Sequence, residues 1–281
     1  MNNKGEIQMI KIFVDSGSSI KQYEKEKYNV EVIPLKILIN NKEYLDGVNL
    51  DMDTFYDGLI NSKEFPKTSL PCLETTKKEV MKYVNNGDDV IILTISSGIS
   101  GTYNAIRLLF EDQPKVKVID SLTAVGGIKI LVKEINKYLD KSIEFITEKI
   151  GKLIKKIRVF AVPETLKYLH KGGRLSTIGY TSGTLLNIKP VIELRNTVSV
   201  ANKTIGIKKA ISMIVSKLNN CDTNYPIVPS YTYNDENLNL LIEKTDKKYQ
   251  DIMLEKDNLD PAIASHWGPN AFGYIFVEKG E

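Results

Sequence analysis

The sequence has little of what metal sites and most catalytic sites are built from. It contains only two histidines, His170 and His266, and two cysteines, Cys72 and Cys221. The histidines have no metal-ligand partner at helical spacing, so no metal site is expected. The cysteines lie far apart and form no CxxC pair, which is typical of reduced thiols and predicts a cytoplasmic protein. We expect no cofactor.

Long apolar runs and a strong charge of one sign are also missing. The longest apolar stretches fall far short of the ~20 residues that span a bilayer, so no transmembrane segment is expected. The stretch 1–19 holds a short apolar piece that runs into Asp15, which indicates a first strand and not a signal peptide. The net charge is only +3, and the lysines are mixed with acids, so nucleic acid is not expected as a partner.

What the chain does contain is an alternation of short Val- and Ile-rich runs with helical patterns. This alternation is typical of an α/β domain with a largely parallel sheet. After Val162 the pattern changes, and a hairpin turning at Arg195-Asn196 indicates antiparallel pairing. We therefore predict two α/β domains with a boundary near Pro163. The first, 1–163, has a mainly parallel sheet, and the second, 164–281, is smaller and mixed.

The strands and helices are expected in the following ranges. Expected strands of the first domain cover 9–15, 30–40, 90–96, 116–120 and 157–162, and a long helical pattern covers about 126–156. In the second domain, a helix at 207–220 follows the hairpin. We then expect a strand near 225–233, a helix at 236–249 and strands near 251–256 and 272–279.

Small hydroxyl side chains gather in the stretch ISSGISGTYNAI, residues 95–106, directly after an expected strand. In open α/β sheets, ligands bind beyond the carboxyl ends of the strands. Ser100, Gly101 and Thr102 fall at the first turn of the next helix, where free N–H groups and the helix dipole favour an anion. Ser97 lies in the same loop. The simpler alternative is a serine N-cap in a loop that needs glycine for its turn.

The composition of this loop limits the anion that it can hold. A P-loop needs a lysine after its glycines, and neither that lysine nor a GxGxxG fingerprint is present. A second loop, KTSLPC, adds the hydroxyls of Thr68 and Ser69. Nucleotide phosphates usually recruit Arg or Lys, whereas hydroxyls and amides without a cation suit a singly charged carboxylate. We expect a small acid or a lipid head group.

A small-molecule hydrolase or acyl-transfer enzyme is the alternative from a different class. Ser100 would be its nucleophile, His266 its base and Asp15 the acid that orients the base. The local sequence around Ser100 is G-I-S-G, not the G-x-S-x-G elbow. A plain polar residue before the turn Gly268-Pro269 is the simpler interpretation of His266. A third class, an interaction or regulatory module, would keep the fold but have no enclosed apolar pocket.

The segment LKYLHKGGRLS, residues 166–176, is the third unusual stretch. We expect a short helix that ends at Gly172 in a left-handed cap. Arg174 follows directly, which places a cation near the domain boundary.

Together these stretches resemble the DegV family of bacterial proteins. The family's motifs are T-S-x-P, S-S-x-x-S-G-T-[YF], L-x-x-L-x-x-G-G-R-[LI]-S, I-K-P and H-x-G-x-x-A-x-G. They occur here in the same order, over nearly the whole chain. They are TSLP (68–71), SSGISGTY (96–103), LKYLHKGGRLS (166–176), LLNIKP (185–190) and HWGPNAFG (266–273).

The resemblance implies a two-domain α/β lipid-binding protein, not an enzyme. Its ligand would be one long-chain fatty acid, such as a C16 or C18 acid, held between and within the domains. Carried over by motif, Thr68 and Ser100 contact the carboxylate, and His266 belongs to the surrounding hydrogen-bond network. The other expected contacts are Ser69, Ser97, Gly101 and Thr102, with Asp15, Ser16 and Arg174 one layer further out.

The resemblance also implies a protein partner, with one departure from the family pattern. Some members carry the acyl chain for a separate fatty acid kinase. Where the family commonly has K-x-R-x-R-K-K-A, this chain has KTIGIKKA, so Ile205 and Ile207 replace arginines. Fatty-acid binding remains expected, and the kinase partnership is in doubt. Apolar residues that line a pocket cannot be told from core residues by pattern, and the sequence leaves acyl length, unsaturation and oligomeric state open.

Overall fold

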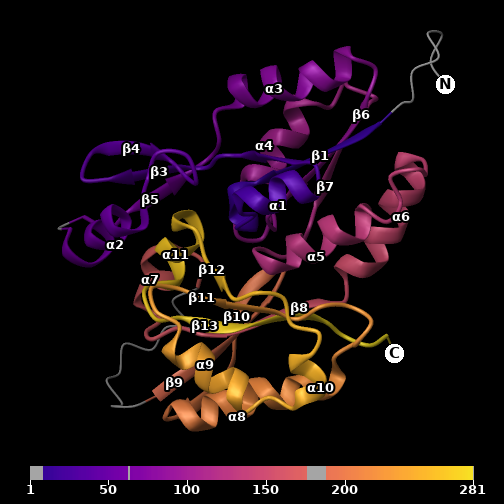
Figure 1. Cartoon of the computed structure of the whole chain (residues 1–281). Coiled ribbons are helices and arrows are strands. Elements are labelled where there is room, and N and C mark those ends of the chain that lie inside the picture. The colour runs from indigo at the N-terminus through magenta and orange to yellow at the C-terminus, as the bar shows by residue number, and fades with distance from the viewer. Residues whose placement is uncertain (1–8, 63, 176–187, 281) are drawn as a thin grey trace.

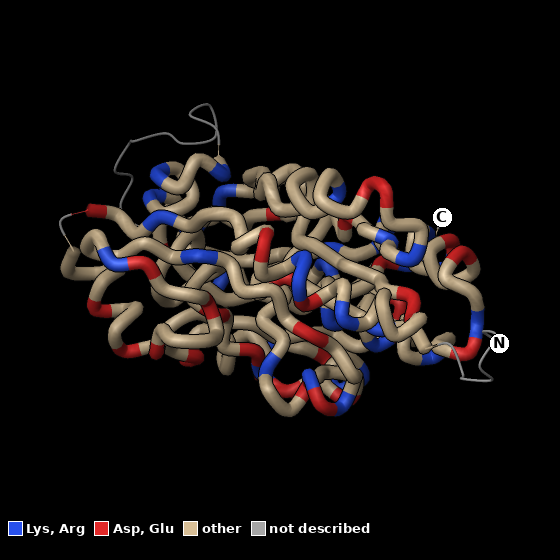
Figure 2. Tube along the Cα trace, turned by 90° about the horizontal axis from the view of Figure 1, so that it is seen from above, with Lys and Arg blue, Asp and Glu red and all other residues tan. Residues whose placement is uncertain are grey.

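The computed structural model of the chain describes residues 9–62, 64–175 and 188–280. Figure 1 shows the first half of the chain, in indigo to magenta, packed against the second half, in orange to yellow. Residues 176 and 185–187, which belong to two of the motifs quoted above, lie outside the described residues. Figure 2 shows Lys and Arg mixed with Asp and Glu along the trace.

The first half is built on a parallel sheet with the strand order β2-β1-β6-β7. Its central strands β1 and β6 are almost entirely buried, as expected when helices cover both faces of a parallel sheet. The predicted mainly parallel sheet is therefore confirmed. Its strands are β1 (Ile10–Asp15), β2 (Val30–Ile33), β6 (Asp89–Thr94) and β7 (Val116–Asp120).

The stretch 30–40, expected as one strand, is in fact two strands in two different sheets. The chain leaves the parallel sheet after Ile33, because Pro34 has no N–H to donate to a continuing ladder. The second part joins a three-stranded antiparallel sheet with the order β4-β3-β5. Its strands are β3 (Lys36–Ile39), β4 (Lys42–Leu45) and β5 (Lys67–Ser69).

The second half is built on a six-stranded sheet with the order β10-β9-β8-β13-β11-β12. Every neighbouring pair is antiparallel except β11 with β12. β8 lies in the middle of this sheet, so the expectation that 157–162 belongs to the mainly parallel sheet is wrong: the chain changes sheets before β8. The division into domains near Pro163 stays a prediction. The strands are β8 (Ile157–Val162), β9 (Ile188–Arg195), β10 (Thr197–Ile205), β11 (Val228–Tyr231), β12 (Asp257–Asn258) and β13 (Phe272–Val277).

Helices cover these sheets, and α5 is buried on all sides between the two halves, which is typical of a helix inside a core. Within the described ranges, no helix is long and apolar enough to cross a membrane. The helices are η1 (Ser16–Ser18), α1 (Gln22–Lys27), α2 (Met52–Asn61), α3 (Leu73–Asn85), α4 (Thr102–Leu109), α5 (Gly126–Ile135), α6 (Ile143–Ile154), α7 (Lys167–Lys171), α8 (Ile207–Lys217), η2 (Leu218–Asn220), α9 (Glu236–Glu243), α10 (Lys247–Gln250) and α11 (Pro261–Trp267).

The predicted hairpin is confirmed, and its tip docks on the first half. β9 and β10 turn at Asn196, whose φ of 66° is one that asparagine tolerates. The Ser96 hydroxyl lies 2.5 Å from the Asn196 carbonyl oxygen and donates to it. A Cβ at Gly98 would lie only 2.4 Å from the same oxygen, so no larger residue fits there without a shift. The loop after β6 and the hairpin are thus in direct contact.

Other local predictions are also wrong. The expected helical stretches 126–156 and 236–249 are each two helices, α5 with α6 and α9 with α10. Gly172 ends α7 with an ordinary φ of −72°, and the left-handed residue is Gly173, with a φ of 72°. The stretch 251–256 is not a strand. Within it, Met253 forms one isolated bridge to Ile227, and regular pairing with β11 begins only at β12.

Candidate functional site

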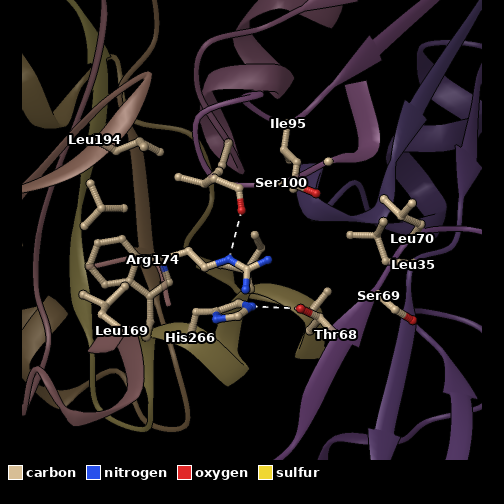
Figure 3. Close-up of a pocket in the computed structure, with 17 residues that line it drawn as sticks. Leu35, Thr68, Ser69, Leu70, Ile95, Ser100, Leu169, Arg174, Leu194 and His266 are labelled. Atoms are coloured by element: carbon tan, nitrogen blue, oxygen red, sulfur yellow. Dashed lines mark hydrogen bonds between the residues drawn. The ribbon is translucent and has the colours of Figure 1, made fainter. Parts of the chain in front are cut away.

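A cavity of about 340 Å³ lies where the two halves meet. Its walls come from the loops after β5 and β6, from α7 and α11, and from both sides of the hairpin tip (Figure 3). Its polar lining consists of Thr68, Ser69, Ser100, Arg174 and His266. Gly101 and an apolar set complete it: Leu35, Leu70, Ile95, Ile99, Ala124, Leu169, Leu194, Val198, Ala262, Ile263 and Trp267.

The loop after β6 places Ser100 and Gly101 as the sequence predicts. α4 begins at Thr102 with Gly101 as its N-cap, so both residues stand at the first turn of the helix. The Ser100 hydroxyl accepts a hydrogen bond from the Thr102 N–H at 3.3 Å and lies 2.8 Å from the Thr102 hydroxyl. Thr102 itself is fully buried and does not line the cavity. Ser100 therefore accepts a hydrogen bond from the first residue of the helix and lines the cavity at the same time.

Thr68 and His266 are brought together from opposite ends of the chain. Pairing of β5 with β3 sets Thr68 opposite Ile37, and the last turn of α11 carries His266. The Thr68 hydroxyl oxygen lies 2.9 Å from Nε2 of His266. A Cβ at Gly172 would lie 2.2 Å from Nδ1 of His266, so glycine is what allows α7 to pack against the ring.

The imidazole of His266 is neutral at physiological pH. Burial of the ring, together with the nearby charge of Arg174, lowers the pKa of His266 to about 3. Nδ1 is buried and has no hydrogen-bond partner among the residues that the structure describes. An unpartnered nitrogen costs least as a bare lone pair, which favours the tautomer with the proton on Nε2.

Arg174 brings a cation into the cavity, so the expectation of an anion site without a cation is wrong. Its Nε donates to the Ile99 carbonyl at 2.9 Å and its Nη1 to the Gly172 carbonyl at 2.6 Å. Burial lowers the pKa of Arg174 below its ordinary value. No acidic side chain pairs with Arg174 within the described part of the chain. A positive group without a counter-ion therefore borders the cavity.

The hydrolase triad is not assembled. Asp15 is fully buried and accepts hydrogen bonds from the backbone N–H groups of Gly17 and Ile95, at 2.9 and 2.8 Å. Burial raises the pKa of Asp15 to about 7. Among the described residues, no hydrogen bond joins Ser100 to His266 or His266 to Asp15. The arrangement therefore lacks the proton relay that a serine nucleophile needs.

The remaining predicted residues support loops instead of lining the cavity. The Ser16 hydroxyl accepts from the backbone N–H of Leu35 at 3.1 Å, and Leu35 is part of the cavity wall. The N–H of Ser97 donates to the Asp120 carboxylate at 3.1 Å. The apolar lining was not predicted, because a residue such as Leu194 follows the same pattern as its buried neighbours in β9.

A second, narrow apolar cavity of about 30 Å³ adjoins the first one. The two share Ala124, Leu194 and Trp267 in their walls. The second cavity lies against one face of the six-stranded sheet and extends the apolar space into the second half.

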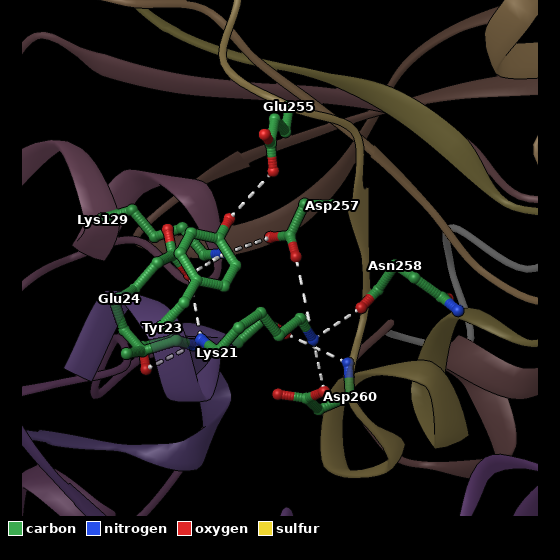
Figure 4. Close-up of polar contacts among 11 residues, drawn as sticks. Lys21, Tyr23, Glu24, Lys129, Glu255, Asp257, Asn258 and Asp260 are labelled. Carbon is green, nitrogen blue, oxygen red and sulfur yellow. Dashed lines mark hydrogen bonds and ion pairs between the residues drawn. The ribbon is translucent and has the colours of Figure 1, made fainter. Parts of the chain in front are cut away.

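A buried group of charges joins the two halves at the N-terminal end of α11 (Figure 4). It is called the charged cluster here and consists of Lys21, Glu24, Lys129, Asp257 and Asp260. Lys129 of α5 is 2.9 Å from Glu24 and 3.1 Å from Asp257, and all three side chains are buried. Lys21 is 2.5 Å from Asp260, the N-cap of α11. The sequence pattern did not predict this cluster, because its members are far apart in the chain.

Asp46 completes the support of α11. Its Oδ1 accepts from the N–H of Ala262 in the first turn of the helix at 3.3 Å. Burial, with the charge of Asp260 second, raises the pKa of Asp46 to about 7. Burial likewise raises the pKa of Asp257 to about 6, against the opposing effect of Lys129.

Comparison with known proteins gives consistent matches over the whole chain. A family model described as "Uncharacterised protein, DegV family COG1307" matches residues 9–279. A DegV domain-containing protein of Clostridium acetobutylicum is 30% identical, over 97% of this chain and 100% of the relative. The crystal structure of a fatty acid binding DegV family protein from Streptococcus agalactiae is 28% identical, with a TM-score of 0.87 over 98% of this chain and 100% of that one. A stearic acid-binding protein from Eubacterium ventriosum is 26% identical, with a TM-score of 0.84 over 96% of this chain and 99% of that one.

Proposed function

The chain belongs to the DegV family, and we propose that it is a non-catalytic carrier that binds one long-chain fatty acid in the cavity between its halves. Solved structures with the same fold bind fatty acids, stearic acid among them. The observation that carries the proposal is the lining of the cavity: a mostly apolar wall in which hydroxyls, a neutral imidazole and one arginine come together.

The polar groups supply what a carboxylate requires. With the proton of His266 on Nε2, the ring donates to the Thr68 oxygen, and the Thr68 hydroxyl proton is then free for the ligand. Ser100 adds a second hydroxyl at the positive end of α4. The carboxylate supplies the counter-charge that Arg174 lacks among the described side chains, because a carboxylate and a guanidinium attract strongly in a partly buried site.

The acyl chain supplies most of the affinity. At ~0.8 kcal/mol per buried methylene, about fourteen methylenes contribute roughly 11 kcal/mol of transfer free energy before the cost of association. Each hydrogen bond from Thr68 or Ser100 to the charged carboxylate contributes about 1.5–3 kcal/mol. The tail therefore sets the affinity and the hydroxyls set the orientation. The main cavity has a volume typical of ligand pockets.

Solvent extraction of the purified, unboiled protein followed by mass spectrometry tests the proposal. We expect a near-equimolar fatty acid, or uptake of added fatty acid after delipidation. Ser100→Ala should weaken binding by ~10–100-fold without abolishing it. Ser97→Ala, whose side chain lies in the same loop but does not line the cavity, is the matched control and should bind like the natural chain.

Three results would count against this proposal. An empty extract together with failure to take up added fatty acid would mean that the cavity serves another anion. Complete loss of lipid from folded Ser100→Ala protein would contradict the ranking of tail over head. Labelling of Ser100 by a fluorophosphonate probe would reveal a free nucleophile and favour the hydrolase or acyl-transfer alternative.

A fatty acid kinase is the protein partner that the family resemblance implies, and two residues argue against this partnership. Ile205 ends β10 with 66% of its surface exposed, and Ile207 begins α8. Both stand where the family pattern has arginines, so two positive charges of that pattern are absent here. We expect fatty acid binding to persist while kinase-dependent phosphorylation of the bound lipid is slow, and a normal rate would contradict this. The cytoplasmic location stays a prediction from the cysteines.

A further inference from the structure

The narrow cavity contains a buried hydroxyl for which the proposed carrier function has no use. Ser230 on β11 is 4% exposed, and its side chain lines this otherwise apolar space. The Ser230 hydroxyl has no hydrogen-bond partner among the residues that the structure describes. A buried hydroxyl left without a partner is costly, so its position calls for a ligand group that completes it.

The sheet leaves room beside this hydroxyl. In the register of β11, β13 and β8, Ser230 pairs with Gly273 and Gly273 pairs with Ala161. Residues directly opposite one another share a face, so these three small residues form a furrow across the sheet. A parallel row of larger residues, which includes Ile275 and Val159, borders it. The row of small residues ends at Ser230, because the next residue in the same row is Asp257 of β12, which belongs to the charged cluster. Ser230 itself lines the narrow cavity.

Other buried hydroxyls differ from Ser230 in their bonds or in their place. The Thr232 hydroxyl donates to the Gly268 carbonyl at 2.6 Å, and the Ser265 hydroxyl donates to the Ala262 carbonyl at 2.9 Å. Thr94 is unpartnered like Ser230 but lines neither cavity. Ser230 thus combines two properties: an unpartnered hydroxyl and a position in a cavity that adjoins the main one.

We propose that Ser230 binds an oxygen atom carried on the acyl chain, so that the ligand class of this protein is the long-chain hydroxy or oxo fatty acids. The inference rests on the proposed carrier function. The Ser230 hydroxyl donates to the oxygen of the ligand, which replaces the hydrogen bond that the fold does not provide. The narrow cavity holds about 30 Å³, which is enough for a group of this size and too little for a long stretch of chain.

Binding of stearate and of positional isomers of hydroxystearate to the delipidated full chain tests this assignment. We expect at least one isomer, with its hydroxyl at a mid-chain or distal carbon, to bind ~10-fold more tightly than stearate. Ser230→Ala should remove that preference while stearate binding stays unchanged. Thr94→Val is the matched control, because it removes a buried unpartnered hydroxyl outside both cavities, and it should keep the preference.

Two outcomes overturn the assignment: every isomer binds no more tightly than stearate, or the preference survives Ser230→Ala. Both leave the carrier function intact, because stearate still binds. Failure of stearate and of every isomer to bind the natural chain would instead remove the carrier function, and this inference with it.

Discussion

The two ends of α11 are both buried polar regions, and they are built in opposite ways. The N-terminal end, at Asp260, belongs to the charged cluster, in which Lys21 and Lys129 face several carboxylates. The C-terminal end carries His266, whose neighbours are the Thr68 hydroxyl, the backbone of Gly172 and Arg174, which has no acidic partner among the described residues. At the N-terminal end each cation is paired with carboxylates, whereas at the C-terminal end Arg174 has no acidic partner among the described residues.

This difference separates the part that fixes the helix from the part that receives a ligand. A buried ion pair is costly to break, because removing one partner leaves the other charge unpaired. The charged cluster therefore holds α11 against the first half whether or not a ligand is present. At the C-terminal end, by contrast, the hydroxyls of Thr68 and Ser100 and the charge of Arg174 are fully paired only when an anionic ligand binds. Changes at the first end should alter stability, and changes at the second should alter affinity.

The largest effect is expected from Lys129→Met. The substitution leaves Glu24 buried without its cation and removes the nearer of the two cations of Asp257, and it should lower the free energy of unfolding by about 3–5 kcal/mol. Urea denaturation of both proteins measures it. Lys152→Met is the matched control, because Lys152 and its partner Glu148 are both exposed, and it should cost at most ~1 kcal/mol. Equal losses in the two variants would contradict the role assigned to the charged cluster.

A smaller effect is expected on the pH dependence of stability. The pKa of Asp46 is raised from 3.8 to about 7 in the folded protein, so the folded state holds this proton more tightly than the unfolded state. The stability that this group contributes is fully present below pH 3.8 and is lost as the pH rises towards 7. Asp46→Asn should therefore make the free energy of unfolding fall less steeply between pH 4 and 7.

Asp15 and Asp257 act in the same direction as Asp46, while His266, whose pKa is lowered, acts in the opposite one. The informative quantity is thus the difference between the natural and Asp46→Asn curves, measured by urea denaturation at each pH. Parallel curves over this range would show that Asp46 is ionised throughout.

The smallest effect is expected at the other end of α11. With a pKa of about 3, His266 is neutral from pH 6 to 8, so its charge state contributes nothing to the pH dependence of fatty acid affinity there. His266→Gln should weaken binding by a constant factor across this range, as measured by fluorescent fatty acid displacement. A factor that grows as the pH falls towards 6 would mean that a protonated His266 holds the carboxylate.

The sequence was sufficient where local patterns decide the structure. The Val- and Ile-rich runs predicted the parallel sheet, and the serine-rich loop placed Ser100 at the start of a helix. Local patterns failed where a distant contact decides. The segment 30–40 looks like one strand until Pro34 sends its second part to another sheet. Gly172 and Gly173 are equal candidates for a left-handed cap, and His266 requires the first of them for another purpose.

The residue types of the site were predictable, and the depth of its cation was not. Thr68, Ser100, His266 and Arg174 all stand in recognisable motifs, but Arg174, expected one layer further out, lines the cavity itself because α7 packs against α11. The missing partner of Ser230 is likewise a property of the assembled sheet, because an unpaired hydroxyl leaves no trace in a sequence. A missing hydrogen-bond partner can be recognised only in the folded structure, where all neighbouring residues are known.

The contact between Gly98 and the hairpin tip has a consequence for how such a protein can be recombined. Gly98 comes from the first half and Asn196 from the second. A Cβ at Gly98 would lie 2.4 Å from the carbonyl oxygen of Asn196. A chimera of two relatives joined near Pro163 would inherit the loop from one parent and the hairpin from the other. Any parent with a larger residue at the position of Gly98 would then force the hairpin away and widen the cavity. The two halves of the binding site therefore have to match each other. Among functional chimeras made by exchanging halves, we expect glycine at position 98.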